Sequence, residues 1–387
     1  MASRRKAYHK ELILVGGGHS HIEVLRRFRM RPEKNVRITL INPQPDAQYS
    51  GMLPGLISGH YTLDETNIDL LKLANACGAR FLEDEVQLVE PQKKHIVCLN
   101  RGKISFDVLS LNIGSVSPRP AASPPESLAV KPIWDFQKKF TGILDKIARE
   151  GKTKRIGVVG AGAAGAEIIL ATKYRLENQS SQADRQGHSY HLITAEKEAL
   201  VDQPKKTRTL YMGELEKNNI DIISNFKVTK IKDFTISSGN GGSLKIDILL
   251  WATGAEAPKW IGKSKLNTTP RGFLRVKPTF ESENFQNVFA SGDIAHVEQH
   301  LRPKSGVFAV RQGPPLAKNL RRALRGERLR DFTPQRRTLA IISLGNRNAI
   351  ASHPLLTVKG KWIWKYKNFL DRRFIEKYQK LKPMPSV

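Results

Sequence analysis

Two stretches of the chain share one pattern, and this repetition limits the fold more than any other feature of the sequence. Residues 11–25 read ELILVGGGHSHIEVL, and residues 155–170 read RIGVVGAGAAGAEIIL. Each begins as an apolar run typical of a strand, passes through glycines and continues with apolar residues at helical spacing. A further apolar run follows each one, at 36–41 and at 190–194. We therefore expect an α/β chain with two Rossmann-like dinucleotide-binding domains of the three-layer ββα type.

The second glycine stretch carries a complete GxGxxG motif, formed by Gly160, Gly162 and Gly165. In such motifs the first glycine permits a tight turn, the second lets the backbone approach a pyrophosphate, and the third lets helix and strand pack closely. The free N–H groups at the helix N-terminus then attract phosphates. The motif predicts a dinucleotide site, and a glycine-rich turn that serves packing alone is the alternative.

The first glycine stretch is less regular, because Gly16, Gly17 and Gly18 are followed by His21 where the third motif glycine is required. An imidazole at that position is expected to push the helix away from the strand. His19 and His21 are poor metal ligands, since side chains two positions apart on a helix diverge and no third ligand lies nearby. We therefore expect no metal site.

Several polar and glycine residues stand where each repeat should meet its cofactor. An acidic residue usually ends the second strand of such a unit and bonds the adenosine ribose. The first unit offers Asn42 there, and the second offers Glu196 beside Lys197, which leaves NADH and NADPH both open. Two later apolar runs end at Gly114 and Gly254, and each is expected to bring its glycine close to the cofactor.

A third marker is Gly292-Asp293, which follows the apolar run 287–290. A carboxylate at the end of a strand can accept hydrogen bonds from the sugar-alcohol chain of a flavin. The alternative role for Asp293 is to cap a helix, which would serve the structure alone.

The order of these motifs resembles that of the FAD-containing pyridine nucleotide-disulfide oxidoreductases. Residues 160–167 and 312–320 look like the corresponding parts of type II NADH:quinone dehydrogenases. Residues 15–21, 49–55 and 307–313 resemble, more closely still, the flavoprotein region fused ahead of selenophosphate synthetases, including the histidine in place of the third glycine.

This resemblance implies roles for individual residues. It places Glu167 near the point where nicotinamide meets flavin, with a helix surface charge as the alternative. It places Pro54 and residues 307–313, Gln312 among them, beside the isoalloxazine ring. The NAD(P)H site would contain Gly160, Gly162, Gly165, Glu196 and Gly254, and the FAD site would contain Gly16, Gly17, Gly18, Asn42, Gly114, Gly292 and Asp293.

The two cysteines, Cys77 and Cys98, form no CxxC or CxxxxC pair. Disulfide reduction and sulfide oxidation both need a reactive thiolate, so these activities are disfavoured. We expect an NAD(P)H dehydrogenase that passes hydride to FAD and electrons to a quinone-like acceptor. The alternative is a flavin-containing redox or binding partner in selenium or sulfur metabolism.

The chain is strongly basic, with 64 Lys plus Arg against 36 Asp plus Glu and a formal net charge of +28. Such a surface attracts an anionic membrane, an acidic partner or nucleic acid. Nucleic acid is disfavoured, because the basic residues of the later chain have few aromatic neighbours and form no recognisable reading module. The residues concerned are Arg321, Arg322, Arg325, Arg328, Arg330, Arg336 and Arg337.

The C-terminal segment 359–381 predicts an amphipathic helix. Apolar and aromatic residues recur at Ile363, Tyr366, Leu370, Phe374 and Tyr378, with lysine and arginine around them. Such a helix can lie in a membrane interface, or it can pack on the protein's own core or on a homodimer partner. These alternatives stay open. We expect a cytoplasmic protein, and the alternative is a protein attached peripherally to the cytoplasmic face of the membrane.

The motifs also divide the chain into segments. We expect a first FAD-binding segment at 1–118, an NAD(P)H-binding domain at 150–265, a second FAD-binding segment at 266–330 and a C-terminal region at 331–387. A proline-rich connector at 117–125 links the first two, and a polar surface loop spans 178–189. Within the C-terminal region, runs 338–344 and 349–352 predict a β-hairpin turning at Gly345-Asn346.

Overall fold

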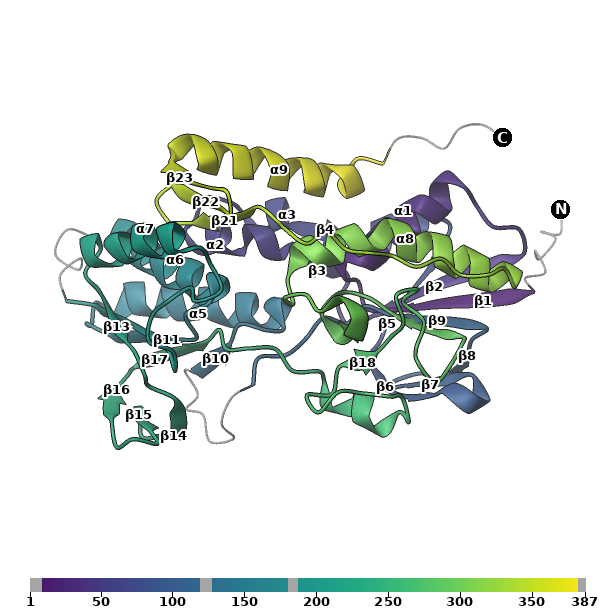
Figure 1. Cartoon of the computed structure of the whole chain (residues 1–387), viewed down its shortest axis with the longest axis horizontal. Helices are drawn as coiled ribbons and strands as arrows, with labels where there is room; N and C mark the ends of the chain where they lie inside the picture. The colour runs from purple at the N-terminus through teal and green to yellow at the C-terminus, as the bar shows by residue number, and fades with distance from the viewer. Residues whose placement is uncertain (1–8, 119–126, 180–186, 382–387) are drawn as a thin grey trace.

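Two parallel five-stranded sheets organise the molecule and lie at the right and left of Figure 1. The computed structural model describes residues 9–118, 127–179 and 187–381. The first sheet has the order β19-β9-β1-β2-β5, and the second has the order β10-β17-β11-β12-β13. The first contains β1 (Lys10–Val15), β2 (Val36–Asn42), β5 (Arg80–Glu83), β9 (Val108–Leu111) and β19 (Val288–Ala290). The second contains β10 (Ser127–Ala129), β11 (Arg155–Val159), β12 (Ser189–Ile193), β13 (Ile220–Ile223) and β17 (Ile248–Trp251).

The glycine stretches fold as the repeat predicts. Both β1 and β11 are buried along almost their whole length, as central strands of parallel sheets must be. Each passes through its glycine loop into a helix, α1 (His19–Met30) in the first half and α6 (Ala163–Gln179) in the second. The two sheets therefore have the same internal order around these strands, which confirms two Rossmann-like units.

Along the chain, a small antiparallel sheet is inserted between two strands of each parallel sheet. In the first half it lies between β5 and β9, and in the second between β13 and β17. Each half thus has a helical layer, a parallel sheet and an antiparallel sheet, which confirms the expected three-layer ββα architecture. The antiparallel strands are β6 (Val86–Glu90), β7 (His95–Cys98) and β8 (Gly102–Ser105), and β14 (Val228–Lys232), β15 (Thr235–Ser238) and β16 (Ser243–Lys245).

Helix α8 (Gly306–Arg325) runs beside α1 and covers the first sheet. The two helices approach closely at Gly313, where a Cβ atom would lie only 2.7 Å from the Cβ of Glu23. Further helices are α2 (Leu53–Ile57), α3 (Leu63–Thr66), α4 (Leu70–Ala76), α5 (Ile133–Glu150) and α7 (Lys205–Lys217). Short strands are β3 (Asp46–Gln48), β4 (Asn67–Asp69), β18 (Leu274–Arg275) and β20 (Ala295–His296), and 3-10 turns lie at Ser50–Met52, Pro91–Lys93, Lys259–Lys263, Gly292–Ile294 and Glu298–His300.

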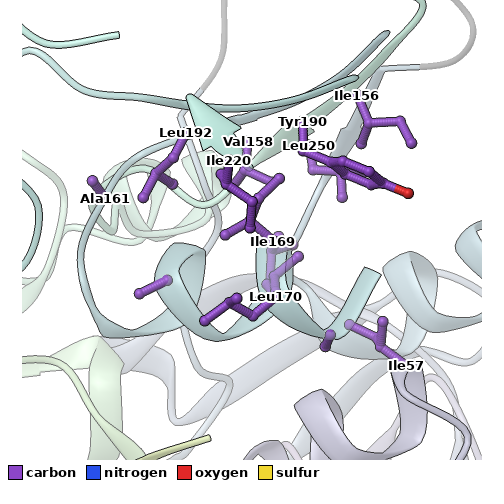
Figure 2. Packing of buried hydrophobic residues seen from close by; sticks show 14 of the residues in the cluster. Ile57, Ile156, Val158, Ala161, Ile169, Leu170, Tyr190, Leu192, Ile220 and Leu250 are labelled. Atoms are coloured by element: carbon purple, nitrogen blue, oxygen red, sulfur yellow. The ribbon is translucent and has the colours of Figure 1, made fainter. Parts of the chain in front are cut away.

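The core of the second half includes a residue from the first. Ile57 of α2 belongs to the same buried cluster as Ile169 and Leu170 of α6, and Figure 2 shows the three near one another. Strand residues Val158 and Leu192 lie on the other side of that helix in the same cluster. Because α2 contains Pro54, which is predicted to lie beside the flavin, this packing links the two halves close to that predicted site.

The C-terminal region contains the predicted hairpin and adds a third strand to it. It forms a three-stranded antiparallel sheet of β21 (Ala340–Ser343), β22 (Ala349–His353) and β23 (Leu356–Gly360), followed by α9 (Lys361–Gln379). The third strand was not predicted from the sequence, because its five residues LTVKG include only two apolar side chains. Helix α9 lies across both halves (Figure 1).

Polar contacts contribute to the attachment of this region. The Tyr378 hydroxyl donates to Glu23 of α1 at 3.0 Å, and Lys359 pairs with Glu214 of α7 at 2.6 Å. The C-terminal region therefore contacts a helix of each half. The proline-rich connector lies mostly outside the described residues, as does most of the predicted surface loop at 178–189.

Candidate functional site

The first glycine loop is held in a conformation that excludes side chains. Gly16 has a φ of +90°, and a Cβ atom on it would lie 2.5 Å from the carbonyl oxygen of Asn112. A Cβ on Gly18 would lie 2.2 Å from the side-chain oxygen of the same residue. The Gly17 N–H donates to the side-chain oxygen of Asn42 at 2.8 Å. The predicted Gly16, Gly17, Gly18 and Asn42 are therefore brought together, and Asn42 bonds the loop itself.

Asn112 was not singled out from the sequence, yet it joins three parts of this site. Its buried side-chain oxygen accepts from the Ser20 N–H at 3.1 Å, at the N-terminus of α1. Its amide nitrogen donates to the carbonyl of Ser291 at 2.7 Å, at the end of β19. The signal for it was its place two residues before Gly114, in the apolar run that ends at that glycine.

The sequence predicted that His21 would push the helix away from the strand. Instead, hydrogen bonds hold its ring between the helix and the sheet. Its Nδ1 lies 2.7 Å from the carbonyl oxygen of Gly16, and its Nε2 lies 2.8 Å from the hydroxyl oxygen of Ser110 on β9. The ring is fully buried, and burial lowers the pKa of His21 to about 4. A neutral imidazole with both nitrogens bonded therefore replaces the missing glycine contact.

Asp293 lies beside this loop and is ionised. Its carboxylate accepts from Lys131 at 2.5 Å and from the Ser115 hydroxyl at 2.9 Å. Burial alone would favour the neutral acid, but Lys131 and Ser115 together hold the pKa of Asp293 below its usual value. Asp293 caps no helix by its side chain, since the residue before the turn Gly292–Ile294 is Ser291 and no side-chain cap bond is formed there. Asp293 therefore does not have the alternative role of a helix cap.

Gly292 and Gln312 meet directly. Gly292 has a φ of +70°, and its N–H donates to the side-chain oxygen of Gln312 on α8 at 2.6 Å. A Cβ on Gly292 would lie 2.4 Å from the amide nitrogen of Asn112. The strand ends of β9 and β19, the first glycine loop and α8 thus converge at one place.

The second glycine loop has the geometry that its motif predicts. Gly160 has a φ of +106°, and a Cβ there would lie 2.5 Å from the carbonyl oxygen of Ala252. A Cβ on Gly165 would lie 1.8 Å from the carbonyl oxygen of Gly160, so helix and strand could not pack around it. Gly162 is exposed and has no atom within 4 Å of the corresponding position. The open backbone there is what a pyrophosphate needs.

Three further predicted residues line open space near the strand ends. A side chain at Gly114 would meet nothing within 4 Å, and one at Gly254 would meet only the Arg271 guanidinium at 3.9 Å. Glu196 and its neighbour Lys197 are exposed three and four residues after β12. Both side chains are free to contact the ribose of a bound dinucleotide.

Glu167 lies on α6, facing the C-terminal sheet. Its carboxylate accepts from the Ser343 N–H of β21 at 2.8 Å. Burial raises the pKa of Glu167 to about 7, against the opposing effect of the Lys367 ammonium on α9. This environment is not that of a simple surface charge. Pro54 is buried on α2, and that helix packs against α6, which carries Glu167.

The comparisons with known proteins agree with this arrangement. Residues 10–313 match the family described as pyridine nucleotide-disulphide oxidoreductase. The chain belongs to this family. It is 22% identical to the type II NADH:quinone oxidoreductase of Staphylococcus aureus, over 95% of this chain and 96% of that protein.

Solved structures of the family share the fold at low identity. The sulfide:quinone oxidoreductase of Aquifex aeolicus superposes with a TM-score of 0.80 at 18% identity, covering 97% of this chain and 93% of that one. NDH2 of Plasmodium falciparum in complex with NADH gives 0.75 at 17% identity, covering 99% and 100%. As a member of the pyridine nucleotide-disulphide oxidoreductase family, the protein is an NAD(P)H-dependent flavoprotein oxidoreductase with FAD and NAD(P)H as cofactors.

The two cysteines do not supply the thiol pair that gives the family its name. Cys98 is buried in β7 and Cys77 lies partly buried after α4. Burial raises the pKa of each thiol to about 11, which keeps both protonated at neutral pH. Neither has the character of a redox nucleophile. Among the described residues, no group of three or more His, Cys, Asp or Glu side chains could hold a metal ion.

The apolar stripe predicted for the last helix is split between two faces of α9. Ile363 and Tyr378 are buried, whereas Tyr366 and Leu370 are 47% and 39% exposed. The inner face packs on the protein's own core, as one alternative held. Its outer face carries exposed aromatic residues. No helix in the described part of the chain is long and apolar enough to cross a membrane.

Three of the seven arginines considered for nucleic acid have partners within the protein. Arg321 and Arg325 both pair with Glu33, at 3.0 and 2.7 Å, and the Arg321 guanidinium lies 4.3 Å from the ring centre of Phe28. Arg322 donates to the carbonyl of Arg328 at 2.9 Å. All three arginines lie on α8, which packs on α1.

Proposed function

We propose that this protein oxidises NAD(P)H through FAD and reduces a quinone, without a redox-active disulfide. The observation that carries the proposal is the pair of glycine loops, each closed to side chains at its turn, with Glu167 and the buried α2 between the two halves. The bound FAD supplies the redox chemistry, because it accepts hydride from NAD(P)H and returns electrons to an acceptor.

The first loop has the features that FAD requires. Gly16, Gly17 and Gly18 turn the chain tightly into α1, whose positive N-terminal end favours a pyrophosphate, and Asn42 bonds that loop. Asp293 is ionised and can accept from the hydroxyls of the sugar-alcohol chain. We propose that these residues, with Gly114, Gly292 and Gln312, bind FAD, and that residues 1–118 and 266–330 form one domain around it.

The second loop would bind NAD(P)H at Gly160, Gly162 and Gly165, with Glu196 toward the ribose and Gly254 nearby. The domain would span 150–265. Holding both cofactors in fixed sites lets the protein align the donor and acceptor atoms, which lowers the barrier without covalent chemistry.

Glu167 is the candidate for proton exchange. Quinone reduction consumes protons, and a carboxyl whose pKa is about 7 can both hold and release one at neutral pH. Its bond to the Ser343 N–H fixes one carboxylate oxygen, and within the described part of the chain the other accepts no hydrogen bond.

A quinone acceptor is supported by two observations. The relatives named above include a type II NADH:quinone oxidoreductase. The buried thiols offer no disulfide to reduce. The predicted link to selenophosphate synthetases, and with it the alternative role as a flavin-containing partner in selenium or sulfur metabolism, rests on sequence motifs alone.

We further propose that the outer face of α9 lies on an anionic membrane surface, where a quinone is dissolved. Trp362 and Phe369 are 62% and 56% exposed, and Tyr366 stands between them. Exposed Lys361 and Lys365 flank these rings. Aromatic rings beside cations on one helix face suit a membrane interface, and the net charge of +28 favours anionic lipid. A homodimer through the same face is the competing proposal.

Rapid mixing tests the proposed reaction. NADH or NADPH should bleach the flavin of the purified protein, and a soluble quinone should restore its colour much faster than air does. A protein without flavin, or a flavin that neither nucleotide bleaches, would refute the proposal. Reoxidation by quinone no faster than by air would remove the quinone acceptor only.

A further inference from the structure

His19, unlike His21, has a buried ring nitrogen with no partner in the described part of the chain. It is the first residue of α1, directly after Gly18. Its Nε2 atom is buried and forms no hydrogen bond. Since an unpaired buried polar atom costs free energy, such an atom in a folded protein calls for an explanation. The buried environment of His21 does not explain the unpaired nitrogen of His19, because side chains two positions apart on a helix point in different directions.

The position of His19 relates it to the cofactor site. Its Nε2 lies 3.9 Å from where a Cβ on Gly306, the first residue of α8, would stand. The negative charge of Asp293 acts on its ring. The nitrogen therefore lies where the N-termini of α1 and α8 and the turn of Asp293 come together. These are three of the elements to which FAD binding is assigned above.

Two aromatic rings hold the imidazole in place. Tyr49 meets it edge-on with 5.4 Å between ring centres, and Phe374 of α9 lies 5.8 Å away. Tyr49 and Phe374 also stack on each other at 4.3 Å. The ring is thus fixed on its apolar sides, and the C-terminal helix contributes one of the two contacts.

We propose that His19 donates a hydrogen bond from Nε2 to an oxygen of the flavin half of FAD, either a phosphate oxygen or a ring carbonyl. Burial lowers the pKa of His19 to about 4, so the ring is a neutral donor at physiological pH. Phe374 is then a positioning residue, because it packs against the imidazole ring that carries the donor. The inference rests on the proposed FAD site, and it adds a side chain to a loop whose glycines offer only backbone groups.

The test compares His19→Phe with His21→Phe in the full chain. The first variant keeps the aromatic packing and removes the donor, and we expect its dissociation constant for FAD to rise about ten-fold or more. His19→Gln, which restores a donor, should recover part of the affinity. An altered absorbance spectrum of the bound flavin would identify a ring carbonyl as the acceptor. Weaker binding with an unaltered spectrum would identify the phosphate.

Stability separates a cofactor role from a structural one. Without added FAD, His19→Phe should unfold at the same temperature as the wild type or higher, since it removes an unpaired buried nitrogen. His21→Phe should unfold at a lower temperature, because it loses two hydrogen bonds. The inference fails if His19→Phe binds FAD as the wild type does, or if it destabilises the FAD-free chain as much as His21→Phe. A wild-type protein that binds no FAD would instead refute the proposed site.

Discussion

Gly162 and Gly165 belong to one motif, but changing each to alanine should affect different properties: stability at Gly165 and NADH binding at Gly162. At Gly165 the added Cβ would lie 1.8 Å from the carbonyl oxygen of Gly160, and Cβ atoms in proteins essentially never come closer than 3.0 Å to such an atom. Helix α6 must therefore move away from β11 by more than an ångström. Overpacking of this kind costs about 1–3 kcal/mol or more, so Gly165→Ala should lower the free energy of unfolding by that amount.

At Gly162 the same methyl group meets no atom within 4 Å, and the residue does not require a positive φ. Gly162→Ala should therefore leave the free energy of unfolding unchanged or raise it by about 0.4–1 kcal/mol. Its effect should fall on NADH binding, because the methyl group stands where the pyrophosphate must approach the backbone.

Denaturant unfolding and NADH titration, run on both variants, test this contrast. We expect Gly165→Ala to lose stability, and Gly162→Ala to keep stability while its dissociation constant for NADH rises. If Gly162→Ala were as unstable as Gly165→Ala, the assigned packing would be wrong. If it bound NADH as the wild type does, the second loop would not be the nucleotide site.

Three further changes have expected outcomes. Glu167 has a pKa of about 7 in the folded protein and 4.5 as its ordinary value, so its ionisation costs stability as pH rises between these values. In denaturant unfolding, the free energy of unfolding of Glu167→Gln should therefore rise by about 2–3 kcal/mol relative to that of the wild type between about pH 5 and about pH 8. His21→Asn can keep at most one of two buried bonds and should lose about 1–3 kcal/mol, measured by the same method. Changing Trp362, Tyr366 and Phe369 together to serine should reduce sedimentation with anionic vesicles and leave the turnover of a soluble quinone unchanged; undiminished sedimentation would exclude this face.

Local patterns predicted the parts of the site that depend on neighbours in the chain. Gly160, Gly162 and Gly165 lie within six residues, so the turn, the open backbone and the close packing could be inferred from the motif alone. Asn112 could not be inferred, because its role arises where β9 returns beside β1 and brings it against Gly16 and Gly18. The hydrogen bonds of His21 depend on the same strand through Ser110. A residue whose partners are about ninety positions away leaves no local signal.

The pKa of Glu167 also depends on residues far away in the sequence, which come from the C-terminal region. The family resemblance placed this carboxyl near the cofactors, but its pKa depends on residues from the end of the chain. Ser343 donates to it from β21, and the Lys367 ammonium of α9 opposes the effect of burial. The same lysine also bonds Asp371 and the carbonyl of Gly51, which follows Tyr49 in the first half. A helix proposed to lie on a membrane therefore also sets the charge around the candidate proton carrier. Detaching or shifting α9 should alter the pH dependence of turnover even where both nucleotide loops stay intact.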